Sequence, residues 1–252
     1  MSNVYKALER AERERRVVKP DEVTITDRLA EARVPVFHRP SDPYYLREYE
    51  RLATEISHAC AESALRTIMV TSSQHGEGTS TVSVNLALTL AERGRLNVLL
   101  VDANFRRPAL RQIFHADGTG GLAELVSKEA AWAAAVKETA NANLHLVTVG
   151  RPAANPSQLF ELERFGELLD EFRTRFDITI FDVPPVLPYA DALTLASKVD
   201  RVIMVVQAGR TRRDRVERGK EELEKIGASI FGVVLNREKS YVPLWLQRYF
   251  NL

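Results

Sequence analysis

Short apolar runs alternate with longer amphipathic stretches from residue 66 onward, and this alternation determines the expected fold class. Runs such as NVLLV at 97–101 and RVIMVV at 201–206 are almost wholly hydrophobic, which is typical of parallel strands buried on both faces. The stretches between the runs repeat their apolar residues at helical spacing. The chain is therefore expected to form an α/β domain, a doubly wound and mostly parallel sheet with helices on both faces.

The same pattern predicts individual elements. The expected strands are Thr67–Thr71, Asn97–Val101, Leu144–Val149, Ile178–Phe181, Arg201–Val206 and Ser229–Leu235. The expected helices are Tyr44–Glu62, Thr79–Arg93, one running from Gly121 through Val126 onward, Ser157–Arg175, Ala190–Lys198 and Arg212–Ile226.

The two ends of the chain differ from this central region. Residues 1–16 contain an amphipathic N-terminal helix over 3–16, and residues 17–43 read as a proline-containing linker. The N-terminal helix either packs on its own domain or docks elsewhere, and the pattern leaves both open. The main domain is expected over 44–240, followed by a C-terminal tail over 241–252.

Composition and charge exclude several classes of protein. The 252 residues carry 35 Lys and Arg against 34 Asp and Glu, a net charge of +1, which argues against nucleic-acid binding through bulk positive charge. The single cysteine, Cys60, cannot form an intrachain disulfide and is expected as a packed helical residue. No apolar run approaches 18 residues and the first residues are charged. We expect a cytoplasmic protein that meets a membrane only through a partner.

A candidate phosphate-binding loop follows the first expected strand, at residues 72–81 (SSQHGEGTST). A strand, a glycine-containing loop and a helix in that order place backbone N–H groups around a phosphate. Gly76 and Gly78 permit the tight turn, and Ser80 occupies the position whose hydroxyl binds Mg²⁺ in P-loops. The lysine of that pattern is replaced by Thr79. His75 is expected to be a solvated turn residue.

Two aspartates end later strands and strengthen this interpretation. Asp102 follows the run NVLLV, and Asp182 follows ITIF. In a parallel sheet both carboxylates emerge at the edge where the loop lies. A carboxylate facing a phosphate site can bind Mg²⁺ directly or through water.

Several motifs in the same order resemble the bacterial tyrosine kinases of capsule and exopolysaccharide synthesis. That family carries GEGKST, DxDxR followed by RP, and DxPP, and this chain has GEGTST at 76–81, DANFRRP at 102–108 and DVPPVLPYADA at 182–192. Further similarities are GRPAANPSQL at 150–159, GVVLN at 232–236 and the opening MSNVYKALERAERER.

The resemblance implies a site, a cofactor and partners. It implies ATP or ADP with Mg²⁺, with Ser80, Asp102 and Asp182 as metal ligands and the two aspartates as catalytic residues if the protein is active. The implied nucleotide-binding residues are Gly76, Glu77, Gly78, Thr79, Ser80, Thr81, Arg106 and Asn236. It also implies docking on an inner-membrane polysaccharide co-polymerase, the chain-length regulator, and self-association of the chain.

Four departures from the family pattern bear on activity. Thr79 replaces the lysine and Asn104 replaces the second aspartate of DxDxR. The family's ExxRxxR segment, which serves ring-like association, reads EYERLAT at 48–54. The tail holds only Tyr241 and Tyr249 as candidate phosphoacceptors, where relatives have a tyrosine cluster.

Three hypotheses follow. The first is a kinase-like, nucleotide-binding accessory protein of exopolysaccharide assembly with weak or no phosphotransfer. The second is an active tyrosine autokinase in which Arg106, Arg107 or a neighbouring subunit's arginine replaces the lysine. The third is a partitioning or septum-positioning ATPase, although such proteins carry an additional lysine where this chain has Ser72 and Ser73. The basic run RTRRDRVER at 210–218 is expected to be a solvated helix face.

Overall fold

The computed structural model describes residues 43–116, 120–153 and 155–238. The expected N-terminal helix, the linker and the tail with Tyr241 and Tyr249 lie outside these residues. Within them the chain forms a seven-stranded sheet in the order β3-β4-β2-β5-β1-β6-β7. The strands are β1 (Thr67–Ser72), β2 (Val98–Asp102), β3 (Val136–Glu138), β4 (Leu144–Val147), β5 (Ile178–Asp182), β6 (Arg201–Gln207) and β7 (Ile230–Asn236).

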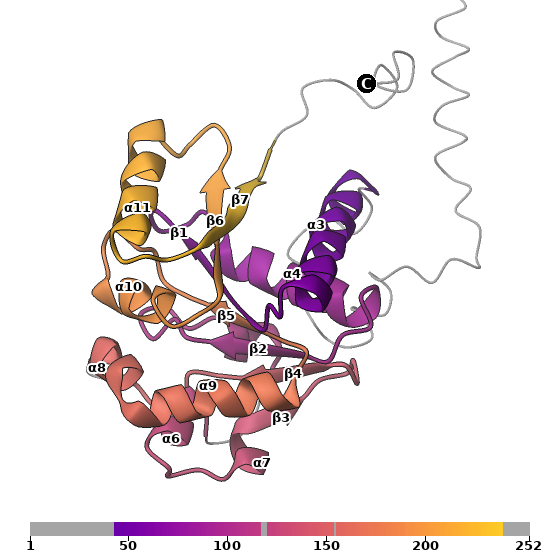
Figure 1. Cartoon of the computed structure of the whole chain (residues 1–252), viewed down its shortest axis with the longest axis vertical. Coiled ribbons are helices and arrows are strands. Elements are labelled where there is room, and N and C mark those ends of the chain that lie inside the picture. Colours follow the sequence, from indigo (N-terminus) through magenta and orange to yellow (C-terminus); the bar gives the residue numbers. More distant parts are fainter. Residues whose placement is uncertain (1–42, 117–119, 154, 239–252) are drawn as a thin grey trace, which may run out of the picture. The chain divides into compact units, whose positions relative to one another are not determined.

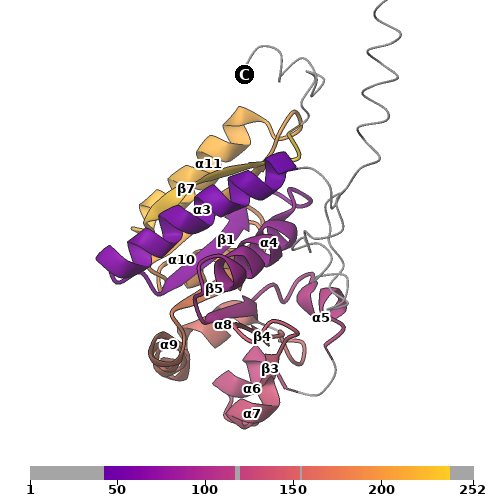
Figure 2. The same ribbon diagram turned by 90° about the vertical axis from the view of Figure 1, so that its right-hand side faces the viewer.

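Helices cover both faces of this sheet, as Figures 1 and 2 show, so the expected doubly wound architecture is confirmed. One face packs against α4 (Thr79–Glu92), on which α3 (Pro43–Glu62) lies. The remaining helices are α5 (Leu110–Ile113), α6 (Leu122–Val126), α7 (Trp132–Ala135), α8 (Pro156–Glu161), α9 (Glu163–Arg175), α10 (Ala190–Ala196) and α11 (Arg213–Lys225). All of these except α5 contribute to the hydrophobic core on the opposite face.

Alternate residues of the strands supply the two cores. On β5, Phe181 faces the core formed with α9 and α10, whereas Ile180 is buried on the other side of the sheet. Every residue of β1, β2 and β5 is buried. This double burial explains why these strands are nearly continuous hydrophobic runs rather than alternating ones.

The structure corrects three expected elements. The helix expected from Gly121 through Val126 onward ends at Val126, as α6, with Ser127 as its C-cap. The helix expected over 157–175 is interrupted at Leu162, whose backbone is extended (φ −59°, ψ 140°), and it forms α8 and α9 instead. The strand expected over 144–149 ends at Val147, because Thr148 and Val149 turn their carbonyls to the N–H groups of Leu122 and Ala123. The short antiparallel edge strand β3 and the helices α5 and α7 were not predicted.

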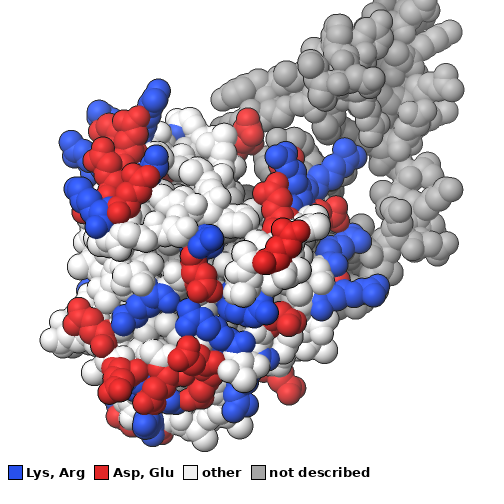
Figure 3. All heavy atoms as spheres, viewed as in Figure 1, with Lys and Arg blue, Asp and Glu red and all other residues white. Residues whose placement is uncertain are grey.

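None of the helices in the described part of the chain combines the length and the hydrophobicity that crossing a membrane requires. On the face shown in Figure 3, positive and negative side chains are interspersed, and they alternate over α11. This distribution agrees with the near-zero net charge.

Candidate functional site

The loop between β1 and α4 lies at the carboxyl edge of the sheet, beside the central strands. Gly78 precedes α4 with φ 93°, in the left-handed region, and no side chain caps the N–H groups of the helix's first turn. Uncapped N–H groups and the positive end of the helix dipole attract an anion. The loop therefore has the geometry expected of a phosphate site at residues 78–81.

Glu77 holds the first half of the loop in shape. Its side chain is 1% exposed, and Oε2 accepts the N–H groups of Ser73 (2.9 Å) and Gln74 (3.1 Å). Its Oε1 accepts the hydroxyl of Thr211, in the turn after β6. The Nδ2 of Asn236 donates to the Glu77 carbonyl oxygen at 2.8 Å. The loop is thus anchored to the ends of β6 and β7 by its own side chain and backbone.

Thr79 occupies the position where the P-loop lysine is expected, and its hydroxyl points back into the protein. Its Oγ1 donates to Ser72 Oγ at 3.1 Å, and Ser72 Oγ in turn donates to the Gln74 carbonyl oxygen at 3.0 Å. The position therefore braces the loop against β1 and offers no cation to a phosphate.

Asp102 and Asp182 are brought together as the sequence predicted. They are directly paired in register at the ends of the adjacent parallel strands β2 and β5, and both are fully buried. Asp102 accepts three backbone N–H groups, from Asn104 (3.1 Å), Ala109 (3.1 Å) and Leu110 (3.0 Å). These bonds fold the DANFRRP segment around its first carboxylate.

Burial raises the pKa of both carboxyls, and the charge of Asp102 raises that of Asp182 further. Burial raises the pKa of Asp102 to about 6, although its three backbone N–H donors oppose the rise. Burial, followed by the charge of Asp102, raises the pKa of Asp182 to about 8, opposed by the hydroxyls of Ser80 and Ser83. Two buried carboxyls that resist ionisation together form a site that a cation would stabilise.

The donors around Asp182 fit a magnesium ion held beside a phosphate. Ser83 Oγ donates to Oδ1 at 3.2 Å, whereas Oδ2 is buried and has no hydrogen-bond partner. Within the described residues, no group of three or more His, Cys, Asp or Glu side chains is placed to hold a metal. Mg²⁺ usually takes one or two carboxylates and completes its shell with phosphate and water. Ser80, Asp102 and Asp182 are the residues that would supply the protein's share.

Arg106, in the DANFRRP segment, contacts residues of the DVPPVLPYADA segment. Its guanidinium makes a two-pronged contact with the buried Asp191, at 3.2 Å and 3.1 Å, and lies over the ring of Tyr189. Tyr189 in turn lies with its hydroxyl 3.0 Å from His75 Nε2. His75 lies in a turn, as expected, but it is half-buried, and its contact with Tyr189 ties the P-loop to this cluster.

Several contributors to the site were not singled out from the sequence. Ser83 lies one helical turn after Ser80, so its spacing could have placed it on the same face of α4. Asp191 stands within the quoted DVPPVLPYADA motif. Thr211 carried no local signal, because its contact with Glu77 spans 134 positions of sequence. Asn236 is buried against the loop, and its contact with Glu77 spans 159 positions of sequence.

Gly78 gives a test of how tightly the loop is built. A Cβ at this position would lie 2.1 Å from Asn236 Nδ2, on a backbone with φ +93°. We expect Gly78→Ala to lower the free energy of unfolding by about 1–3 kcal/mol, through backbone strain and loss of the Asn236 contact. Gly227→Ala is the control, because it has φ +75° but nothing within 4 Å of its Cβ. Equal losses in denaturant unfolding of the two variants would contradict the role of Asn236.

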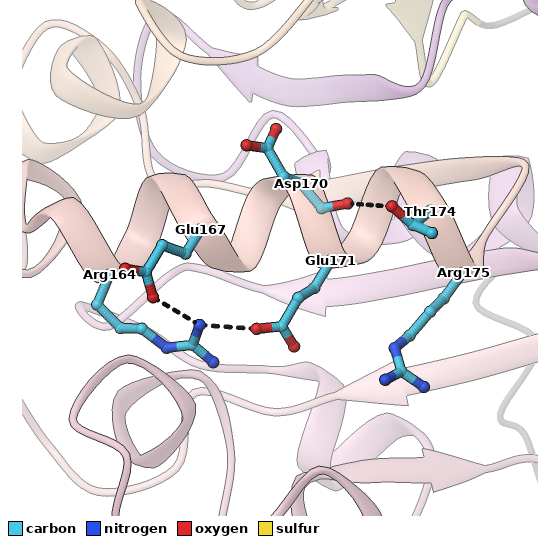
Figure 4. Close-up of a pocket in the computed structure, with 6 residues that line it drawn as sticks. All are labelled: Arg164, Glu167, Asp170, Glu171, Thr174 and Arg175. Carbon is cyan, nitrogen blue, oxygen red and sulfur yellow. Dashed lines mark hydrogen bonds and ion pairs between the residues drawn. The ribbon is translucent and has the colours of Figure 1, made fainter.

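A separate hollow on α9 does not belong to this site. Figure 4 shows its lining, and the residues all come from one helix: Arg164, Glu167, Asp170, Glu171, Thr174 and Arg175. Arg164 donates to Glu167 at 3.0 Å and to Glu171 at 2.7 Å. Arg164, Glu167 and Glu171 therefore neutralise one another along α9, and none of them contacts the loop or Asp102 and Asp182.

Comparison with known proteins identifies the family of this chain. The model of the AAA domain family matches residues 65–226, from β1 to the end of α11. The tyrosine-protein kinase YwqD of Bacillus subtilis is 32% identical over 192 residues, covering 76% of this chain and 81% of that protein. The chain belongs to the bacterial tyrosine kinase family. The crystal structure of the VpsO kinase domain, at 35% identity and a TM-score of 0.69, covers 78% of this chain and 98% of that domain.

The fold of this chain is also found outside the tyrosine kinase family. The septum site-determining protein MinD of Pyrococcus horikoshii, solved with Mg-ADP, has a TM-score of 0.57 and 21% identity, covering 73% of this chain and 76% of that one. This likeness extends to the fold alone. The family membership favours the tyrosine kinase interpretations over a positioning ATPase.

Proposed function

We propose that this protein is a kinase-like nucleotide-binding accessory protein of exopolysaccharide assembly, with weak or no phosphotransfer. One observation carries the proposal: the loop and both buried aspartates are in place, whereas Thr79 is bonded back to Ser72. The backbone N–H groups of 78–81, with Ser80, Asp102 and Asp182, would hold a nucleotide and Mg²⁺, which supplies charge neutralisation at the phosphates when bound. The cation that stabilises phosphoryl transfer is missing at position 79.

The second aspartate of the family motif is also absent, which supports weak transfer. Asn104 uses its side chain to accept the N–H of Arg107 at 3.0 Å, and its own N–H goes to Asp102. It thus acts as a turn former next to the buried carboxylate, a role that needs no charge.

The alternative, an active autokinase, requires another positively charged group in place of the P-loop lysine. Arg106 is engaged by Asp191 and Tyr189, so this hypothesis relies on Arg107, which is exposed, or on a neighbouring subunit. Asp102 and Asp182 would then be the catalytic residues, and Tyr241 and Tyr249 the phosphoacceptor candidates. Replacement of either aspartate by asparagine would abolish labelling of the tail.

The proposed setting is the cytoplasmic face of the inner membrane, reached through a polysaccharide co-polymerase partner. The support is the resemblance of the co-ordered motifs and the membership in the tyrosine kinase family. Self-association is a further part of the proposal. Residues Glu48, Arg51 and Thr54 share an exposed face of α3, where the family's ExxRxxR segment would make its contacts.

Calorimetric titration of the full chain with Mg·ADP and Mg·ATP tests the proposal, with Thr79→Lys as the gain-of-charge variant. We expect the natural protein to bind, and the lysine to tighten binding by about 10- to 100-fold, as a charged hydrogen bond to phosphate contributes about 1.5–3 kcal/mol. Thr79→Gln is the matched control, because it has similar length but no charge and should not tighten binding.

Two results would contradict different parts of the proposal. If the natural protein binds neither nucleotide at millimolar concentration, nucleotide binding is refuted. If it labels Tyr241 or Tyr249 from ATP as fast as Thr79→Lys does, the weak-transfer part is refuted and the active autokinase is favoured.

A further inference from the structure

Two arginines lie beside the P-loop at the ends of β6 and β7. Arg237 Nη1 donates to the Gly76 carbonyl oxygen at 3.3 Å and to Gln207 Oε1 at 3.3 Å. Arg210 Nη1 lies 3.9 Å from the position that a Cβ on Gly76 would occupy. Both arginines are exposed, so their guanidinium groups are hydrated and able to reorient around an incoming ligand.

Arg210 and Arg237 have no acidic partner among the described residues, in contrast to three other arginines nearby. Arg106 pairs with Asp191, Arg212 with Asp214, and Arg213 with Glu217. The expected solvated helix face thus holds for Arg212 and Arg213, whereas Arg210 precedes α11 and turns toward the loop. Two uncompensated guanidinium groups beside a phosphate loop favour an anionic ligand.

Backbone conformation and hydrogen bonds fix the main-chain positions of both arginines beside the loop. Arg237 has φ 57°, a left-handed conformation that is unfavourable for a side-chain-bearing residue, and its N–H donates to Asn236 Oδ1 at 2.9 Å. Arg210 lies in a turn in which its N–H and that of Thr211 donate to the Gln207 carbonyl oxygen. Thr211 and Asn236 are the same residues that anchor Glu77 of the loop.

The strand order indicates which part of a nucleotide these arginines meet. Asp102 and Asp182 stand on β2 and β5, on one side of β1, whereas β6 and β7 lie on the other side. A nucleotide in the loop with its metal-bearing phosphates toward the aspartates directs its α-phosphate and nucleoside toward β6 and β7.

We propose that Arg210 and Arg237 bind the α-phosphate end of the nucleotide and supply positive charge that Thr79 does not. This inference rests on the nucleotide binding proposed above and adds to it the residues that replace the lysine's contribution to affinity. It places that charge on the nucleoside side of the loop, away from the transferred phosphate. Such an arrangement retains binding without restoring the stabilisation of phosphoryl transfer.

Titration of the full chain with Mg·ADP tests the inference. Arg210→Gln and Arg237→Gln are each expected to weaken binding about tenfold, and the double variant more strongly. Arg210→Lys and Arg237→Lys should retain most of the affinity, because they keep the charge. Arg212→Gln is the matched control: it removes the same charge from an exposed arginine paired with Asp214, and it should bind like the natural protein.

The salt dependence separates charge from a structural role. We expect the difference in Mg·ADP affinity between the natural protein and the glutamine variants to decrease as the NaCl concentration is raised. The thermal unfolding of the ligand-free variants should be unchanged. A loss that is independent of salt and not rescued by lysine would overturn the inference, as would variants that bind like Arg212→Gln while the natural protein binds. If the natural protein itself does not bind Mg·ADP, the proposed function falls together with the inference.

Discussion

Replacing Asp182 with asparagine is expected to stabilise the ligand-free protein at pH 8, by an amount on the order of several kcal/mol. The side chain is fully buried, Oδ2 has no hydrogen-bond partner, and Asp102 is its register neighbour on β2. Ionising Asp182 in the folded state therefore costs free energy that is absent in the unfolded chain. Asparagine is neutral at every pH and removes this cost.

The sign of the pH dependence follows from the raised pKa. The pKa of Asp182 is 3.8 in its ordinary state and about 8 in the fold, so between these values the native state binds more protons than the unfolded state. Stability due to this group falls as pH rises from about 4 to about 8 and changes little above that. Denaturant unfolding from pH 5 to pH 8 should show that the difference in free energy of unfolding between Asp182→Asn and the natural protein increases with pH.

Asp170→Asn is the matched control, because its side chain is 78% exposed on α9 and pairs with Arg173. It should leave the pH dependence unchanged. If the difference in free energy of unfolding between the natural protein and Asp182→Asn is constant with pH, ionisation of Asp182 does not destabilise the fold.

Asp102→Asn is expected to behave differently, although the two carboxyls are adjacent. Asp102 accepts three backbone N–H groups through both oxygens, and an asparagine would turn a donor toward at least one of them. We expect Asp102→Asn to gain less stability at pH 8 than Asp182→Asn, because lost acceptors offset the relieved repulsion. The buried carboxyl of Asp182 thus lowers the stability of the ligand-free protein, and it lies at the candidate metal site. Functional sites commonly contain residues that reduce stability in this way.

The sheet could be predicted from sequence because its central strands are buried on both faces. Each of these strands is a short hydrophobic run that ends in a polar residue, and the predicted and observed limits differ by at most one residue. The break at Leu162 could not be predicted in this way, because apolar residues continue at helical spacing on both sides of it. The strand β3 has three residues, too few to show a period.

The site was predictable in its residues and less so in its contacts. Asp102 and Asp182 follow from strand ends alone, since parallel strands bring their carboxyl ends to one edge. The orientations of Asn236 and Arg237 depend on contacts between segments far apart in sequence, 159 positions for Asn236 and Glu77 and 161 for Arg237 and Gly76. Such contacts leave no local pattern, which is why the basic run at 210–218 did not distinguish Arg210 from its neighbours.

The core behind β5 links stability to the site. Phe172 on α9 is fully buried, with its ring centroid 5.8 Å from that of Trp132 and 6.3 Å from that of Phe181. Phe181 directly precedes Asp182 on β5. A cavity at Phe172 would therefore weaken the support of the strand that carries the buried carboxyl.

Phe172→Ala is expected to lower the free energy of unfolding by about 3–5 kcal/mol, through lost burial and a residual cavity between α9 and the sheet. Leu162→Ala is the control, because this neighbouring residue is 51% exposed and should change stability little. Combining Phe172→Ala with Asp182→Asn tests the link to the site, since residues that share a neighbour couple and distant ones add. If β5 transmits the defect, the stabilisation by Asp182→Asn at pH 8 should shrink in the Phe172→Ala background, because water entering beside Phe181 lowers the cost of ionising Asp182. Strict additivity of the two changes would instead show that the strand remains rigid and that the carboxyl's burial is independent of the aromatic core.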